Sequence, residues 1–393
     1  MIILKNGKLI PMVQKDGAER EFTGDVAFEN GKITAIAKKL DIEGAEVYDV
    51  SGMTVIPGII DAHCHIGMFE DGMGFEGDDG NEMSGTSTPE MRAIDAINPF
   101  DRCFEEARNA GVTTCVSGPG SANVLGGQFA AIKTFGRDVE DMLLKYPVGM
   151  KAAFGENPKR VYESRKTIFT RMQIAATLRR ELTKALEYDR KLKAAAGDET
   201  KRPDRDLAME ELLPVVRREL PLKVHAHRAD DILTAIRIAN EFNIRITLDH
   251  CTEGHLIPEQ IKEALKTVCD GIIIGPLFCD RSKIELRNKT YEAPRILWEN
   301  GIDFALMTDH PVIPEEYLAM TAGVAVREGL PRYEALKSVT LNAAKATGLI
   351  DRVGTLEHGK DADIAVFDGD PLLNVTHCVM TVINGRICHN TLK

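Results

Sequence analysis

Short apolar runs and turn signals alternate at both ends of the chain, in the pattern of short β-strands. These runs are residues 1–5, 25–29, 32–36 and 46–50 at the start, and 363–367, 379–383 and 386–389 at the end. The dipeptides Asn6-Gly7, Asn30-Gly31 and Asn384-Gly385 lie between such runs and are typical of tight hairpin turns. Neither end has enough apolar residues to close a core alone. We therefore expect residues 1–54 and 352–393 to build one small β-sandwich domain together.

Between these ends the pattern changes to strands separated mostly by helical segments. The predicted strands are 55–65, 112–117, 130–134, 148–154, 222–227, 244–250, 271–275 and 304–308. Helical periodicity is seen, for example, at Ile232, Ile236 and Ala239, which fall on one face of a helix. Strand–helix alternation with eight strands is typical of a (β/α)8 barrel of roughly 250 residues or more. A doubly wound open sheet is less consistent, because no Gly-x-Gly-x-x-Gly follows the first strand. The sequence predicts an α/β fold with a TIM-like barrel over residues 55–351.

Two segments interrupt this alternation. Residues 68–99 are acidic, rich in glycine and placed just after the first strand. We expect them to form an active-site loop that is mobile without substrate and partly ordered with it, although a surface insertion would have the same composition. Residues 159–206 are highly charged and helical in pattern. We expect most of them to be a solvent-exposed helical excursion between the fourth and fifth strands.

Histidines gather where the predicted strands end. His63 and His65 lie two residues apart at the end of the first strand, so their side chains point to the same face. Three more of the ten histidines, His225, His227 and His250, also fall at strand ends. Core histidines scattered through a protein would not concentrate in this way. Because converging imidazoles suit a borderline-soft cation such as zinc, the pattern predicts a metal site at the carboxyl-terminal mouth of the barrel.

The composition of the chain mainly argues against certain classes of protein and partner. The 393 residues are 44% hydrophobic and 28% charged, which is ordinary for a folded water-soluble protein. The net charge of −11 gives no reason to expect nucleic acid or an anionic membrane as partner. No apolar run approaches the roughly 20 residues that span a bilayer, and the start lacks the pattern of a signal peptide. Eight cysteines without paired metal spacing favour free thiols in the cytoplasm. We expect a cytoplasmic protein with a small-molecule substrate, and leave open whether it forms a homo-oligomer.

Taken together, the motifs resemble those of the amidohydrolase superfamily, metal-dependent hydrolases with a (β/α)8 barrel beside a small β-sandwich. The matching segments cover nearly the whole chain and are Pro-Gly-Ile-Ile-Asp-Ala-His-Cys-His (57–65), Gly-Val-Thr-Thr (111–114), Val-His-Ala-His (224–227), Leu-Asp-His (248–250), Thr-Asp-His (308–310) and Gly-Lys-Asp-Ala-Asp (359–363). The similarity is greatest to the imidazolonepropionase-like and metal-dependent dipeptidase branch.

This resemblance implies a separate role for each of the strand-end residues. His63 and His65 would hold one divalent metal, and His225 and His250 would hold a second, with zinc expected at both. Asp309 would bind metal and carry a proton to the leaving nitrogen. His227 would hydrogen-bond the substrate.

The ligand from the fourth strand has two candidates. Lys151 lies in a Gly-x-Lys context, and the resemblance implies that carbon dioxide could convert its amine to a carbamate that bridges the metals. Glu156, just past the same strand, is the rival, because some branches use a carboxylate directly. Further out, Asn123 and Arg228 are candidates for substrate binding. Each has a plainer interpretation, as part of a tight connection and as a surface salt-bridge residue respectively.

The implied activity is hydrolysis of the C–N (amide) bond of a cyclic amide or an N-acyl or dipeptide substrate by a metal-bound hydroxide. One alternative is a deaminase of a small cyclic compound that uses a single metal. Such deaminases usually place a glutamate three residues after the fifth-strand histidine, whereas this chain has Arg228 there. The other alternative is a non-catalytic metal-binding scaffold. It is weakened because Asp309 and all the histidines of the motifs are present.

Overall fold

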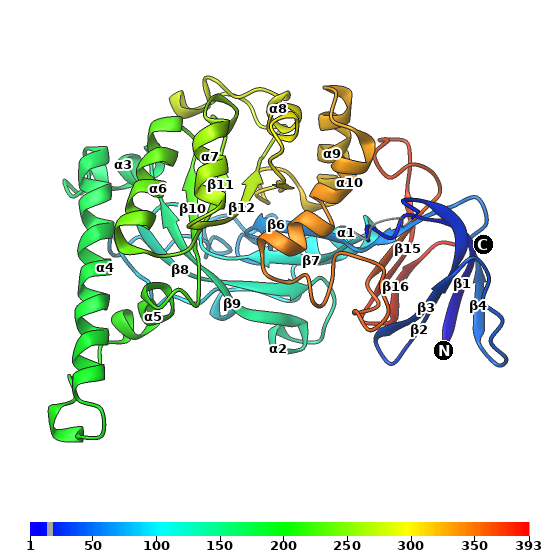
Figure 1. The fold of residues 1–393 in the computed structure, drawn as a ribbon, viewed down its shortest axis with the longest axis horizontal. Helices are drawn as coiled ribbons and strands as arrows, with labels where there is room; N and C mark the ends of the chain where they lie inside the picture. The colour runs from blue at the N-terminus through cyan, green and yellow to red at the C-terminus, as the bar shows by residue number, and fades with distance from the viewer. Residues whose placement is uncertain (14–18, 393) are drawn as a thin grey trace.

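Two eight-stranded sheets organise the chain in the computed structural model, which describes residues 1–13 and 19–392 (Figure 1). The terminal sheet contains β1 (Ile2–Leu9), β2 (Phe22–Glu29), β3 (Lys32–Ala37), β4 (Glu46–Asp49), β5 (Thr54–Pro57), β14 (Ile364–Phe367), β15 (Cys378–Ile383) and β16 (Arg386–Asn390). Its order is β16-β15-β14-β5-β1-β2-β3, with β4 paired to β1. Both ends of the chain therefore contribute to one sheet, as predicted, while its description as a β-sandwich stays a prediction.

Turn dipeptides explain two hairpins of this sheet. Asn30 and Gly31 have φ angles of 51° and 79°, and they join β2 to β3. Asn384 and Gly385, with φ angles of 49° and 72°, join β15 to β16 in the same way. Positive φ at both residues is what a tight two-residue hairpin requires. The prediction of a third turn at Asn6-Gly7 is wrong: the pairing register shifts there, so the dipeptide forms a bulge inside β1.

The second sheet is a nearly closed barrel. Its strands, each paired with the next along the chain, are β6 (Ile59–Cys64), β7 (Val112–Ser117), β8 (Leu125–Lys133), β9 (Leu143–Ala153), β10 (Leu222–Ala226), β11 (Ile246–His250), β12 (Cys269–Ile274) and β13 (Ala305–Leu306). Backbone hydrogen bonds just beyond β13 link the last strand back to the first, from Asp309 N to His63 O (3.3 Å) and from His65 N to His310 O (3.0 Å). The predicted eight barrel strands are all present.

One strand departs from the predicted alternation of strand and helix. β8 runs antiparallel to both β7 and β9, whereas the other neighbouring pairs of the barrel are parallel. Residues 118–124 therefore form a hairpin connection between β7 and β8. Both strands are buried along their whole length, so neither shows the polar–apolar alternation that would mark an antiparallel pair.

The run predicted as one strand at 55–65 is two strands in different sheets. Val55 of β5 pairs with Val366 in the terminal sheet, whereas Ile59 of β6 pairs with Val112 in the barrel. Gly58 lies between them, where an added Cβ would come within 2.2 Å of the Thr113 side chain. Only glycine allows the chain to pass so close at this junction. Because apolar residues continue on both sides of Gly58, the sequence pattern did not reveal the boundary.

Helices cover the outside of the barrel (Figure 1). They are α1 (Cys103–Asn109), α2 (Val139–Met142), α3 (Glu156–Glu163), α4 (Arg171–Ala194), α5 (Leu207–Val216), α6 (Ala229–Phe242), α7 (Pro258–Leu265), α8 (Ala293–Glu299), α9 (Leu318–Arg327), α10 (Arg332–Ser338) and α11 (Leu341–Ala346). One apolar cluster joins them to the strands and includes Leu182 of α4, Leu222 of β10 and Ile232 of α6. The charged segment 159–206 is largely helical, as predicted, and α4 extends beyond the barrel on the side away from the terminal sheet. Among the described residues, no helix combines the length and apolar character that crossing a bilayer requires.

Candidate metal centre

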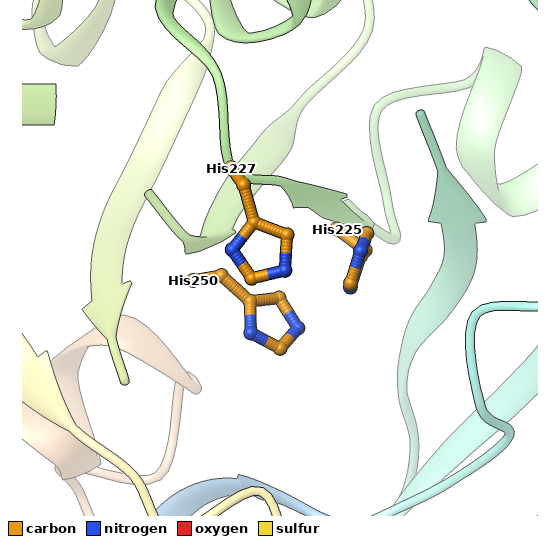
Figure 2. Close-up of side chains that lie close together, drawn as sticks. All are labelled: His225, His227 and His250. Atoms are coloured by element: carbon orange, nitrogen blue, oxygen red, sulfur yellow. The ribbon is translucent and has the colours of Figure 1, made fainter. Parts of the chain in front are cut away.

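The five strand-end histidines lie together at one mouth of the barrel. Figure 2 shows the imidazoles of His225, His227 and His250 facing one another, with ring centroids 4.2–4.7 Å apart. The ring of His63 lies 5.4 Å from that of His250 and 5.3 Å from that of His65. All five side chains are buried. The structure therefore brings together residues that the sequence places up to 187 positions apart, from His63 to His250.

Strand register explains this convergence. In the parallel pair β10–β11, His225 is opposite Asp249 and Ala226 is opposite His250, so both strands end at the same level. His250 then adopts a left-handed backbone, with φ of 70°. This conformation is uncommon for a residue other than glycine, and the surrounding structure must hold it. The strand thus turns at the residue whose ring joins the cluster.

Hydrogen bonds fix the orientation of four of the five rings. The Nδ1 atoms of His63, His65, His227 and His250 lie 2.6 Å from Asp249 Oδ2, 2.6 Å from Gly118 O, 2.7 Å from Thr252 Oγ1 and 3.1 Å from Gly275 O, respectively. Where the partner is a carbonyl or carboxylate oxygen, Nδ1–H must donate, which leaves Nε2 with a free lone pair. Such partners are the usual means of orienting a metal-binding imidazole.

Burial favours the neutral form of four of these imidazoles, those of His63, His225, His227 and His250. It lowers the pKa of His63, His225 and His250 well below the ordinary value, and it lowers the pKa of His227 to about 3. In each case removal of the charged form from water is the largest cause. His225 Nδ1 is buried without a hydrogen-bond partner among the described residues. Neutral imidazoles with free lone pairs are the form that binds a metal.

Asp309 faces two of these lone pairs. Its Oδ1 lies 3.3 Å from His65 Nε2 and 3.7 Å from His63 Nε2. Because His65 donates through Nδ1 to a carbonyl, its Nε2 is an acceptor and so is the carboxylate. Two acceptors at this distance need a cation or a proton between them. The donor set therefore fits a divalent ion.

The donor atoms form two overlapping groups, each lying within 4.8 Å. One contains His225, His227 and His250, and the other contains His63, His250 and Asp309. His250 belongs to both. His227, predicted as a substrate-binding residue, lies as close to the other imidazoles as a ligand would, so the geometry favours a place in the metal group for it.

A hydrogen-bond network holds Asp309 in place. The backbone N and Oγ1 of Thr308 both donate to Asp61 Oδ2, at 2.8 and 2.6 Å. On the other side, His310 N donates to Thr308 Oγ1 at 3.0 Å. These bonds flank Asp309, whose φ of 56° lies in the left-handed region. Asp61 stands inside the Pro-Gly-Ile-Ile-Asp-Ala-His-Cys-His motif, but its partner Thr308, just after β13, could be recognised only once β6 and β13 were placed side by side.

Lys151 enters the same group from β9. Its side chain is fully buried, and its Nζ lies 3.4 Å from His63 Nε2. Burial lowers the pKa of Lys151 to about 8. The rival, Glu156, is half-buried at the start of α3, and within the described residues its carboxylate belongs to neither group of donor atoms. The geometry therefore favours Lys151 as the fourth-strand residue of the centre.

The sequence-based prediction did not include two further charged residues near the histidines. Glu285 is almost fully buried, and its Oε1 lies 3.7 Å from His227 Nε2. Lys223 places its Nζ 3.1 Å from Asp249 Oδ2. Glu285 lies in the loop after β12 with no motif around it, whereas Lys223, two residues before His225 on β10, could have been flagged as a second lysine on a barrel strand.

Asn123 and Arg228 have partners elsewhere. The Asn123 amide donates to Glu82 O (2.6 Å) and Thr88 Oγ1 (2.8 Å), and its Oδ1 accepts from the Tyr162 hydroxyl (2.6 Å). It therefore ties the acidic loop to the barrel. Arg228 pairs through two nitrogens with Asp230 at the start of α6. The structure does not bring either residue to the histidines, and the prediction that they bind substrate gains no support.

A cleft of about 950 Å³ opens beside this centre. The loop 68–99 forms much of one wall, and Phe69 of this loop packs its ring 5.7 Å from that of His65. Gly126 also lines this cleft, and an added Cβ there would come within 3.2 Å of the Lys151 side chain. The acidic loop thus borders the approach to the histidines, as expected for an active-site loop.

Replacing Asp249 with asparagine should weaken metal binding about 10–100-fold, the usual effect of losing a carboxylate that orients a metal-binding histidine. The amide cannot provide the charge that holds the Nδ1–H of His63. Competition with a coloured chelator would measure the affinity. Asp270→Asn is the matched control, because Asp270 lies on the neighbouring β12 and pairs with Arg245 (2.9 Å) away from the centre. Equal affinity in both variants would remove Asp249 from the site.

Comparison with known proteins agrees with this geometry. The sequence model of the Amidohydrolase family matches residues 54–388. The crystal structure of an amidohydrolase from Thermotoga maritima MSB8 superposes with a TM-score of 0.94 and 41% identity, covering 99% of this chain and 100% of that one. Amidohydrolase tasK of Hapsidospora irregularis is 32% identical over 89% of this chain, which spans only 38% of that protein's length. An imidazolonepropionase of Fusobacterium nucleatum is 23% identical over 98% of both chains.

Proposed function

The chain belongs to the amidohydrolase family, and we propose that it is a metal-dependent hydrolase of C–N bonds. The observation that carries the proposal is that His65 Nε2 lies 3.3 Å from the Asp309 carboxylate, inside a cluster of buried imidazoles. Two acceptors at this distance need a cation or a proton between them, and a set of buried imidazoles with a carboxylate suits a divalent ion.

We assign the ligands by proximity. His63 and His65, which both face Asp309, would hold one divalent ion with it. His225 and His250, with His227 in reach, would hold a second, and we propose zinc for both. When bound, such ions polarise the scissile carbonyl and bring the pKa of water near 7. The substrates we propose are cyclic amides, N-acyl amino acids or dipeptides.

Asp309 is the group we propose for proton transfer. Hydrolysis of an amide needs a base that takes a proton from the attacking water and returns it to the leaving nitrogen. Asp309 Oδ1 lies beside His63 and His65, where the attacking oxygen would be placed. Its backbone is held by the Thr308–Asp61 hydrogen bonds, so the carboxylate keeps its direction through both transfers.

For Lys151 we propose carboxylation. Its neutral amine would attack the carbon of carbon dioxide and lose a proton, giving a carbamate with two anionic oxygens. The position of Nζ, 3.4 Å from His63 Nε2, would place those oxygens among the histidines. Burial supports this by disfavouring the ammonium, since the pKa is lowered to about 8.

Protein purified without chelator should contain two divalent ions per chain. Four metal-binding histidines, Asp309 and a ligand from β9 exceed what one tetrahedral site needs. Elemental analysis would give the ratio, and a screen of lactams, hydantoins, N-acyl amino acids and dipeptides would test hydrolysis. A ratio that stays near one after metal is added would favour the single-metal alternative. No turnover of any amide by fully loaded protein would contradict the hydrolase proposal.

A further inference from the structure

We infer that Lys283 and Asn157 bind a substrate carboxylate beside the metal centre, so that the preferred substrate is an N-acyl amino acid or dipeptide with a free α-carboxylate. This inference rests on the proposed hydrolase function and narrows its substrate class. It separates these substrates from neutral cyclic amides such as lactams and hydantoins.

The first support is a chain of contacts that leads from the histidines to the cleft. Asn157 Nδ2 lies 3.4 Å from His225 Nε2 and donates to Ser121 Oγ at 2.7 Å. Lys283 Nζ donates to Asn157 Oδ1 at 2.7 Å. Asn157 and Ser121 both line the cleft of about 950 Å³. An ammonium therefore stands one side chain away from His225, and the side chain between them, Asn157, lines the cleft.

The second support is that the ammonium of Lys283 has N–H groups that are not used in hydrogen bonds within the described residues. It carries three N–H groups, and one is used by Asn157. Its nearest carboxylate, Glu285, lies at 4.0 Å and is too distant for a hydrogen bond. Within the described part of the chain, no other hydrogen bond of this ammonium is found. Its side chain is 26% exposed, and its one carboxylate neighbour among the described residues, the buried Glu285, is held at the long distance of 4.0 Å, so the ammonium can still donate to a ligand.

The place of Asn157 beside His225 suits an α-carboxylate. In an N-acyl amino acid the carboxylate carbon is two bonds from the scissile nitrogen. A carbonyl held at the histidines would thus place the carboxylate within reach of Asn157 and Lys283. A neutral cyclic amide offers no charged partner there, and the ammonium would gain nothing from it.

Away from Asn157, the lining of the cleft disfavours a second anionic group on the substrate. Its lining carries the carboxylates of Asp78, Asp79, Glu82, Glu90 and Asp95. Of the three arginines that also line it, Arg92 is already paired with Glu211 at 2.6 Å. Like charges repel across such a wall. An acidic residue on the acyl side should therefore be a poorer substrate than a neutral or basic one.

The test compares N-acetyl-L-amino acids with their matched carboxamides. Wild-type protein loaded with zinc should show a kcat/KM about ten- to hundredfold higher for the free acids, the usual effect of one charge-assisted hydrogen bond. Lys283→Met should lose that preference, so that its kcat/KM for the free acids falls to about its own value for the carboxamides. Lys283→Arg should keep most of it. Lys262→Met is the matched control, because Lys262 pairs with Glu259 on α7, away from the cleft.

Calorimetric binding of the same acids separates this inference from the hydrolase proposal. Tighter binding of the acid than of the carboxamide, lost in Lys283→Met, supports the carboxylate site even if neither compound is cleaved. Turnover without any preference for the acid would overturn the inference and leave the hydrolase proposal standing. A preference that Lys283→Met retains would also overturn it, because the carboxylate would then be bound elsewhere.

Discussion

Asp309→Asn should lower turnover by at least about 10²–10⁴-fold, the range attributed to general acid–base groups, while the fold survives. Asparagine has nearly the same shape but cannot take the proton from the attacking water. It also tolerates the left-handed backbone that Asp309 adopts, so the φ of 56° should not strain the variant. Steady-state kinetics and thermal unfolding, measured on metal-loaded protein, would check the two parts of this expectation.

Asp303→Asn is the matched control for this variant. Asp303 lies just before β13, and its exposed carboxylate pairs with Lys337 at 3.3 Å, away from the histidines. We expect its turnover to match that of wild type. Activity of Asp309→Asn within tenfold of wild type, at equal metal content, would exclude Asp309 from proton transfer.

Lys151→Ala should lose metal and activity together. If Lys151 is carboxylated, its truncation removes two anionic oxygens from the centre, and the remaining imidazoles are neutral. Elemental analysis should then show fewer ions per chain than in wild type, with turnover reduced in proportion or more. A small carboxylate such as formate or acetate, added with metal, should restore part of both. Lys151→Arg should fail as well, because guanidinium keeps its charge and cannot form the carbamate.

Lys133→Ala is the matched control, which would show the effect of losing a buried lysine that lies away from the metal centre. Lys133 is almost fully buried on β8, but its ammonium pairs with Asp361 (3.2 Å) and Asp363 near the terminal sheet. We expect this variant to unfold at lower temperature while each folded chain keeps its metal. If Lys151→Ala behaved the same way, with normal metal content, Lys151 would be a structural lysine and the carbamate proposal would be wrong.

Local signals carried most of the sequence-based prediction. The barrel strands and the histidines at their ends are encoded by short apolar runs that stop at a polar or imidazole side chain. Val112–Ser117, for instance, was placed without error. Because a barrel brings all such strand ends to one face, the cluster of His63, His225 and His250 followed from strand positions alone.

The features that the sequence-based prediction did not include depend on contacts between residues far apart in the chain. The direction of β8 and the division at Gly58 are decided by which strands lie side by side, and an unbroken apolar run carries no mark of either. The partners of Asn123, Glu82 and Thr88, come from the acidic loop, whose path no local pattern predicts. Glu285 was missed because it reaches His227 from a loop without a recognisable motif.

The reversed direction of strand β8 lowers the number of loops that can vary at the catalytic face of the barrel. In a regular barrel each of eight strands ends at that face and is followed by a loop of its own. Here β7 and β8 share the hairpin 118–124, so the face is built from seven connections. The shared hairpin also supplies Gly118, whose carbonyl holds His65, and Ser121, which contacts Asn157. Insertions that diversify specificity during evolution should therefore accumulate in the other six connections, with the loop 68–99 as an example already present.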